Sequence, residues 1–154
     1  MNAMRITIDD LTDPPVVALL DEHVSELRSL SPPESTHALD LSELRGADVT
    51  VWVARDGQVV LGCGAPKELT SAHGEIKSMR TARVAQRRGV ARQILVEILG
   101  EARRRGLRRL SLETGSEAFF APARALYAAH GFTECPPFGP YRPDPLSAFM
   151  TRDL

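Results

Sequence analysis

The sequence predicts a mixed α/β fold in which helices pack on a single sheet. Short β-branched segments alternate with segments of helical period along the 154 residues. The composition, 43% hydrophobic and 25% charged, is that of an ordinary globular protein rather than a disordered one. Neither an internal repeat nor a linker divides the chain, so we expect one domain over residues 1–154.

The first half of the chain begins with a strand and contains a β-hairpin. Ile6 and Ile8 alternate with polar neighbours, as in a half-buried strand. Pro14 suits the first turn of a helix, and Asp56-Gly57 is a strong hairpin signal because glycine accepts a positive φ. We therefore expect a strand over 5–10, a helix from Pro14, a short helix over 38–44, and strands over 49–54, 59–61 and 75–81.

The apolar period changes at Gly89, where the second half begins. Beyond it, apolar residues such as Leu95 and Ile98 recur on one helical face, and Gly106 suits the position just after a helix end. We expect a helix from Gly89 to Gly106, a strand over 110–114, a short helix over 122–130, and final strands over 132–135 and 147–150.

Composition also excludes several classes of function. A net charge of −1 gives no field that would favour nucleic acid or an acidic membrane as a partner. No apolar run is long enough to span a bilayer and the first residues lack a secretory signal, so we expect a cytoplasmic protein. Cys63 and Cys135 form no Cys-x-x-Cys pair, and the four histidines show no ligand spacing, so we expect idle thiols and no metal.

The segment from Gln86 to Arg92 has the chemistry of a phosphate site. A glycine at the start of a helix lets a ligand approach the backbone, where unpaired N–H groups and the helix dipole attract anions. Arg87, Arg88 and Arg92 add positive charge nearby. A purely structural Arg-Gly turn is the alternative. The chain has neither a P-loop nor a Gly-x-Gly-x-x-Gly motif.

The same segment resembles the coenzyme-A signature of the GNAT acetyltransferases, Gln/Arg-x-x-Gly-x-Gly/Ala, which Gln86-Arg87-Arg88-Gly89-Val90-Ala91 satisfies. The segment 125–132 is similar to the family's Leu-Tyr-x-x-x-Gly-Phe, and the resemblance covers about residues 5–154. It implies a mixed, mostly antiparallel sheet flanked by helices on both faces. Phe120 departs from the family, many members of which have an asparagine there.

The resemblance also implies that acetyl-coenzyme A (acetyl-CoA) is the co-substrate and that the acetyl group passes directly to an amine. By family position, the main chain of Met79 would stabilise the oxyanion, and Met79 and Thr81 would contact the pantetheine arm. The residues predicted to bind the coenzyme are Met79, Arg80, Thr81, Gln86, Arg87, Arg88, Gly89, Val90, Ala91 and Arg92.

Glu75 is the candidate base that removes the amine's proton, since several family members hold a catalytic glutamate at this register. Strand alternation would place Glu75, Lys77, Met79 and Thr81 on one face. Partial burial would bring the pKa of this carboxyl closer to that of an ammonium ion. The alternative is an ion pair between Glu75 and Lys77 or an arginine.

Tyr127 is the candidate acid, because a phenol stays protonated at neutral pH and can donate a proton to the leaving thiolate. A tyrosine packed against the sheet with its hydroxyl satisfied is the alternative. Four residues, His37, Arg45, Tyr141 and Arg142, lie in irregular segments that often shape the acceptor pocket in this family, although a structural or solvent-exposed role is the first expectation for each. The loop 135–141 could wall that pocket or a homodimer interface.

The function predicted from the sequence is therefore N-acetylation of a small-molecule amine in a ternary complex with acetyl-CoA. Two alternatives stay open at this stage. One is a non-catalytic acyl-CoA-binding sensor or docking module, which would not need both Glu75 and Tyr127. The other is a protein N-acetyltransferase, which would favour an open groove over a closed pocket.

Overall fold

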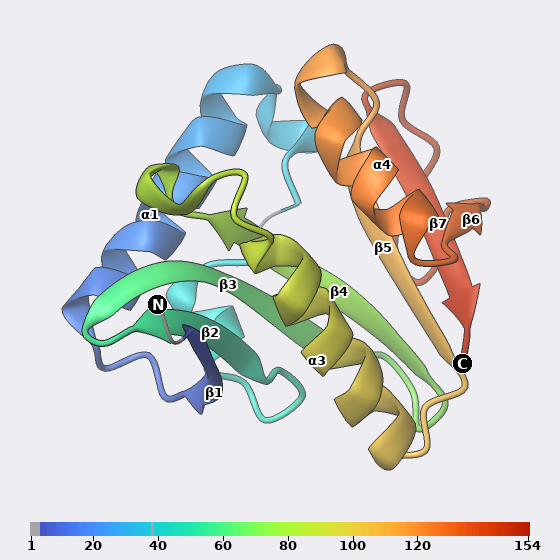
Figure 1. Ribbon diagram of the computed structural model, residues 1–154. Coiled ribbons are helices and arrows are strands. Elements are labelled where there is room, and N and C mark those ends of the chain that lie inside the picture. The colour runs from blue at the N-terminus through green and yellow to red at the C-terminus, as the bar shows by residue number, and fades with distance from the viewer. Residues whose placement is uncertain (1–3, 38) are drawn as a thin grey trace.

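The computed structural model describes residues 4–37 and 39–154 and confirms the predicted order of elements (Figure 1). Seven strands form one sheet in the order β1-β2-β3-β4-β5-β7-β6. Neighbouring strands are antiparallel except β4 and β5, which are parallel. The strands are β1 (Met4–Asp9), β2 (Val51–Asp56), β3 (Val59–Glu68), β4 (His73–Thr81), β5 (Arg109–Gly115), β6 (Thr133–Glu134) and β7 (Ser147–Asp153).

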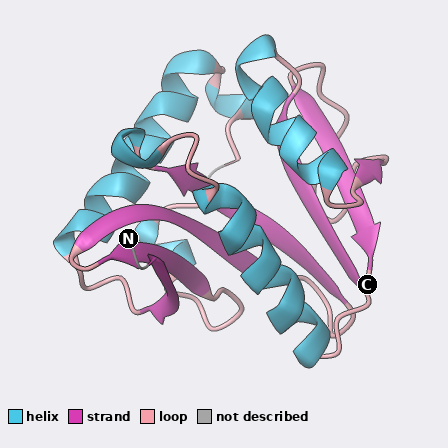
Figure 2. Ribbon diagram, in the orientation of Figure 1, coloured by secondary structure: helices cyan, strands magenta, loops and turns pink. Residues whose placement is uncertain are grey.

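Helices cover both faces of this sheet, as Figure 2 shows. The predicted short helix over 38–44 is confirmed in its second part, while Ala38 lies outside the described residues. The α-helices are α1 (Pro14–Leu30), α2 (Leu41–Leu44), α3 (Val90–Arg104) and α4 (Ala121–Ala129), and the single 3₁₀ turns are η1 (Pro33–Ser35), η2 (Arg83–Ala85) and η3 (Ala118–Phe120).

Each face of the sheet has its own apolar core. On one face, α1 and α2 pack against side chains such as Val53, Cys63 and Ala65. On the other face, Ile94 and Ile98 of α3 and Tyr127 of α4 belong to a second cluster. Burial of an aliphatic side chain contributes about 1.5–3 kcal/mol, so these two cores hold the helices in fixed places on either side of the sheet.

Strand β3 is much longer than predicted, because two of its glycines look like strand breakers in the sequence. Both face α3 in the structure. A Cβ atom at Gly64 would lie 2.9 Å from both Ile94 Cγ2 and Met79 Sδ, and one at Gly62 would lie 2.9 Å from Val90 Cγ1. These glycines therefore allow the helix to approach the sheet closely rather than ending the strand.

A bulge in β4 separates residues that the sequence placed together. Cys63 pairs with Arg80 but Ala65 pairs with Lys77, so β4 has one extra residue opposite Gly64. Ser78, at this bulge, has a φ of +53°. The predicted alternation is therefore wrong beyond Lys77.

The bulge leaves Glu75 and Lys77 on the face covered by α1 and moves Met79 and Thr81 to the α3 face. Lys77 pairs with Ala65, whose side chain belongs to the core under α1. Met79 instead packs with the core under α3, and Thr81 pairs with Gly62, which faces that helix.

The parallel strands β4 and β5 pair only at one end. Their register runs from His73 with Arg109 to Ile76 with Leu112, after which the two strands separate (Figure 1). Beyond this point β4 pairs with β3 and β5 pairs with β7. The sheet is therefore split at its centre, and the split lies beside the start of α3.

Candidate active site

One cavity of about 680 Å³ occupies the split between β4 and β5. At one end it is lined by the turn that precedes α3 and by part of α4, and at the other by α1, η1 and the acidic side chains of β4 and β5. We call these two ends the coenzyme half and the acceptor half. Glu75 and Tyr127, which were predicted as base and acid, line this same cavity.

The coenzyme half is built from backbone at the start of α3. Gly89 occupies the N-cap position with a φ of +75°, and no side chain caps the helix. Gln93 N–H is the first to bond back, to Gly89 O at 3.1 Å. Among the described residues, none of the N–H groups from Arg87 to Arg92 donates a hydrogen bond to the protein. This row of unpaired donors at a helix start is suited to a phosphate group.

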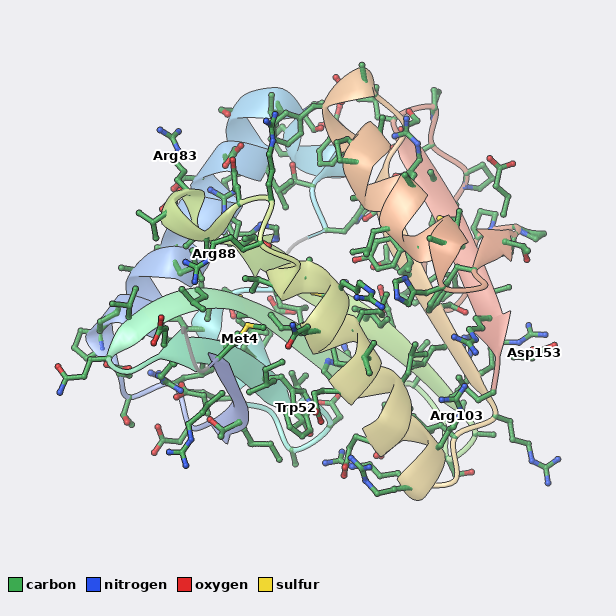
Figure 3. The ribbon with its side chains drawn as sticks, in the orientation of Figure 1. Met4, Trp52, Arg83, Arg88, Arg103 and Asp153 are labelled. Atoms are coloured by element: carbon green, nitrogen blue, oxygen red, sulfur yellow. The ribbon has the colours of Figure 1, made fainter. Side chains whose placement is uncertain are left out.

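Four exposed arginines surround this turn: Arg83, Arg87, Arg88 and Arg92. Figure 3 shows Arg83 directed outward and Arg88 at the start of α3. Arg87 and Arg92 line the main cavity, whereas Arg88 lines a separate cavity of about 230 Å³ with Met4 and Leu61. The cavity is therefore positively charged beside its unpaired N–H groups.

Arg80 was also predicted to bind the coenzyme, but its guanidinium is committed elsewhere. It forms ion pairs with Glu22 (2.6 Å) and Glu26 of α1. Its two terminal nitrogens are therefore engaged by α1, while Arg80 still lines the cavity.

Tyr127 is carried by α4 at the boundary between the core and the cavity. The residue is 5% exposed and packs against Phe132, with ring centroids 5.7 Å apart. Burial raises the pKa of Tyr127, so its hydroxyl stays protonated and can act as a donor. Phe120, at the position where the family has an asparagine, also lines the cavity and fills the space beside Gly115.

The acceptor half contains a buried network around Glu75, which is 3% exposed. Lys77 Nζ donates to Glu75 Oε2 at 3.2 Å and to the Tyr141 hydroxyl oxygen at 2.7 Å. The Tyr141 hydroxyl in turn donates to the same carboxylate oxygen, Glu75 Oε2. The ion pair with Lys77, which the sequence offered as the alternative for Glu75, is therefore present.

Tyr141 reaches Glu75 because the proline-rich loop over 136–146 folds across the acceptor half. Its ring packs edge-on against His37, at a centroid distance of 5.0 Å, and lies 5.5 Å from the ring of Phe149. Asp144 in the same loop accepts a hydrogen bond from Ser35 Oγ of η1 at 2.5 Å. This loop is thus fastened to η1, and its last residue, Leu146, lines the cavity.

Glu113 of β5 is a second acidic residue of the acceptor half, and sequence reasoning did not single it out. Burial raises the pKa of Glu113 to about 7. In the described part of the chain it takes part in no ion pair within 4.0 Å. Its only sequence signal is a charged residue near the end of a strand, which is too common a feature to mark a site.

The comparisons with known proteins agree with this geometry. The model of the acetyltransferase (GNAT) family matches residues 16–132. A Bacillus subtilis protein named uncharacterized N-acetyltransferase YsnE is 55% identical, over 98% of this chain and 100% of its own length. An Azospirillum brasilense protein named IAA acetyltransferase is 43% identical over 90% of both chains. The crystal structure of a GNAT family acetyltransferase from Elizabethkingia anophelis with acetyl-CoA bound has a TM-score of 0.68 at 16% identity, over 98% of both chains.

The split sheet and the relatives together define an N-acetyltransferase that uses an acyl-CoA donor. The chain belongs to the GNAT acetyltransferase family. The predicted fold, a mostly antiparallel sheet with helices on both faces, is confirmed. Within residues 4–37 and 39–154, no helix has the length and apolar character needed to cross a membrane.

Proposed function

We propose that this enzyme transfers the acetyl group of acetyl-CoA to a primary amine of a small molecule, with both substrates bound at once. The observation that supports this most directly is the continuous cavity, which joins unpaired backbone donors at one end to the carboxylates of Glu75 and Glu113 at the other. A donor in the coenzyme half and an acceptor in the acceptor half would meet between the separated strands. We further propose that residues 1–154 form one domain that contains the whole site.

The coenzyme half fits a coenzyme A group. A Cβ atom at Gly89 would meet nothing within 4 Å, so the space next to the unpaired N–H groups is open to a phosphate. We propose that these groups, with Gln86, Arg87, Arg88 and Arg92, hold the pyrophosphate, and that the main chain of Met79, Arg80 and Thr81 holds the pantetheine arm. When bound, acetyl-CoA supplies the acetyl group and a thiolate leaving group.

Glu75 is our proposed proton acceptor during formation of the carbon–nitrogen bond. Lys77 and Tyr141 both bond to Oε2, which leaves Oε1 without a partner among the described side chains. This second oxygen can take a proton from the attacking nitrogen, while the network keeps the carboxylate in place. A positioned acid or base of this kind contributes typically 10²–10⁴ in rate.

Tyr127 is our proposed proton donor to the departing sulfur. Its raised pKa keeps the hydroxyl protonated over the range in which the enzyme would work. The residue lies on the α3 and α4 side of the split, across the cavity from Glu75. The two residues can therefore act on the nitrogen and on the sulfur, respectively.

The fastened loop beside the acceptor half supports a small molecule over a protein as the acceptor. The bond between Ser35 and Asp144 fastens the loop to η1, and Tyr141 with His37 fills the space beneath it. An extended peptide would need an open groove at this place. One 43% identical relative is named IAA acetyltransferase, so IAA also belongs among the acceptors to test.

The decisive experiment is a screen for thiol release from acetyl-CoA in the presence of single acceptors. The panel contains primary alkylamines, aromatic amines, amino acids, IAA and a short peptide with a free N-terminus. We expect release with at least one small amine and none with the peptide. Peptide acetylation alone would contradict the small-molecule proposal. Coenzyme binding without release for any acceptor would contradict the proposed function as a whole.

A further inference from the structure

Glu113 lies one residue beyond the point at which β4 and β5 separate. Glu75 pairs with Ser111 and Ile76 pairs with Leu112, so continued pairing would have placed Lys77 opposite Glu113. The strands part at that position, and Lys77 bonds to Glu75 and Tyr141 instead. The split thus leaves Glu113 as a half-buried carboxylate in the wall of the acceptor half, with no ion pair to another described residue.

We propose that Glu113 is a second catalytic carboxylate, which takes the first proton from the acceptor's ammonium group before the nitrogen attacks. This inference rests on the proposed function and adds to it a separate task for each of the two carboxylates, Glu75 and Glu113. The acceptor class it implies is a basic alkylamine, which enters the site as its ammonium form.

The proton balance of the reaction requires two such transfers. An alkylammonium nitrogen carries three protons, whereas the nitrogen of the acetylated product carries one. One proton moves to Glu113 and then to solvent, which leaves a neutral amine with a free electron pair. As the carbon–nitrogen bond forms and the carbon–sulfur bond breaks, Glu75 takes the second proton. Tyr127 supplies a proton to the sulfur and is restored to its hydroxyl form by the proton that Glu75 gives up.

The surroundings of Glu113 suit the first transfer better than those of Glu75. Burial raises the pKa of Glu113 to about 7, and the nearby negative charges of Glu75 and Asp144 act in the same direction. The Ser147 hydroxyl and the Lys77 cation lower the pKa of Glu113, with effects larger than those of the two negative charges but smaller than that of burial. An alkylammonium resembles lysine, with a pKa of about 10.4, so a carboxylate at about 7 is a much closer match than an ordinary one near 4.3.

Two other ionisable side chains of the acceptor half, Tyr141 and His37, are weaker proton acceptors than their ordinary forms or keep their proton. The Tyr141 hydroxyl keeps its proton, because burial and the charge of Glu75 raise its pKa. Burial also lowers the pKa of His37, which makes its imidazole a weaker base than an ordinary histidine, and the two rings of His37 and Tyr141 pack edge-on. The charges that act on Glu113 are those of Glu75 and Lys77 on β4 and of Asp144 in the loop before β7. Tyr141 interacts with both Glu75 and Glu113, and His37 interacts with Lys77, Glu75 and Asp144.

The test compares two acceptors of the same shape, ethylamine and 2,2,2-trifluoroethylamine. The first is an ammonium ion at pH 7 and the second is already neutral there. We expect Glu113→Gln to lower turnover of ethylamine about 100-fold at pH 7, with recovery as the pH rises, and to leave trifluoroethylamine within about twofold of wild type. Glu75→Gln should lower turnover of both. An equal loss with both amines in Glu113→Gln would overturn the proposal.

A second readout uses the protein alone and needs no reaction. In protein labelled with ¹³C-glutamate, the Glu113 side-chain carboxyl resonance, assigned by its absence in Glu113→Gln, should titrate near pH 7. The exposed Glu134 serves as the control, since Glu134→Gln should change neither that titration nor either turnover. A Glu113 carboxyl that titrates like an ordinary glutamate would overturn the proposal even where neither amine reacts. A Glu113 carboxyl that titrates near pH 7 in a protein that releases no thiol with any acceptor would instead contradict the proposed function.

Discussion

The two halves of the cavity are built in different ways. The coenzyme half consists of consecutive backbone N–H groups from Arg87 to Arg92, ordered by one glycine at the start of a helix. The acceptor half consists of side chains from segments far apart in the sequence. Tyr141 and Glu75, for example, are separated by 66 positions and share a hydrogen bond.

This difference explains what each half can do for the enzyme. Backbone donors do not depend on side-chain identity, so a coenzyme site made from them can stay the same in enzymes with unrelated acceptors. Side chains on loops and strand ends can be exchanged one at a time, as binding residues on a rigid scaffold generally are. We therefore expect substitutions in the two halves to affect separate steps.

The largest effect should follow a substitution in the acceptor half. Glu75→Gln keeps the shape of the side chain but cannot take a proton, so turnover should fall by about 10²–10⁴. Affinity for acetyl-CoA, measured by calorimetry, should stay within about twofold, because the coenzyme half is untouched. Full turnover in this variant would reduce Glu75 to a structural partner of Lys77. A parallel loss of coenzyme affinity would show that the two halves are not separate.

The converse effect should follow Gly89→Glu in the coenzyme half. The new carboxylate would occupy the open space beside the N–H groups and repel a phosphate. We expect affinity for acetyl-CoA to fall about 100-fold, or about 2.7 kcal/mol. Rate at saturating coenzyme should change far less.

Gly106→Glu is the matched control for this substitution. Gly106 also has a positive φ (+80°) with open space around it, and it lies at the far end of α3. The control therefore introduces the same backbone strain and the same charge away from the cavity. If both variants lose affinity equally, strain rather than the phosphate site is the cause.

The contrast between the halves also decides what could be predicted from the sequence. Gly89 and the residues around it form a local motif, so the start of α3 was predicted correctly and its phosphate chemistry could be proposed from the sequence. The hairpin at Asp56-Gly57 was predicted for the same reason. The bulge at Ser78 has no such signal, because serine seldom adopts a positive φ and nothing nearby marks the position. The predicted alternation of side chains between the two faces of β4 is therefore wrong between Lys77 and Met79.

Residues of the acceptor half could not be assigned because their roles depend on distant partners. Lys77 pairs with Glu75 only because β5 departs and Tyr141 arrives from the loop over 136–146. Glu113 becomes unusual only because the same separation removes its expected neighbour. Local periodicity describes which face a side chain occupies, but it does not describe which strand lies next to it or where that strand ends.

A smaller effect should separate the two tyrosines of the chain. Tyr141→Phe removes a hydroxyl that both accepts from Lys77 and donates to Glu75, so it should cost about 1–2 kcal/mol of unfolding free energy. Tyr127→Phe should cost much less, since no partner for its hydroxyl occurs within residues 4–37 and 39–154. Denaturant unfolding measures both. Equal stability losses would show that the network around Glu75 contributes nothing beyond packing.

The smallest effect concerns the pH dependence of stability. The folded-state pKa of Glu113 is about 7, above its ordinary value of 4.5. The folded protein therefore binds this proton more tightly than the unfolded chain, so stability falls as pH rises from about 4.5 to about 7. Glu113→Gln removes this term. Relative to wild type, the variant should gain about 1 kcal/mol between pH 4.5 and pH 8, after allowance for partial exposure.

The comparison must be made as a difference between two proteins, because His23 titrates in the same range with the opposite sign. Burial lowers the pKa of His23 from 6.5 to about 4, so stability is lost as pH falls from about 6.5 to about 4. This term is common to wild type and variant and cancels on subtraction. Urea unfolding at pH 4.5, 6 and 8 then isolates Glu113. A difference that does not change with pH would mean that its carboxyl is ordinary, and that the acceptor half holds one functional carboxylate rather than two.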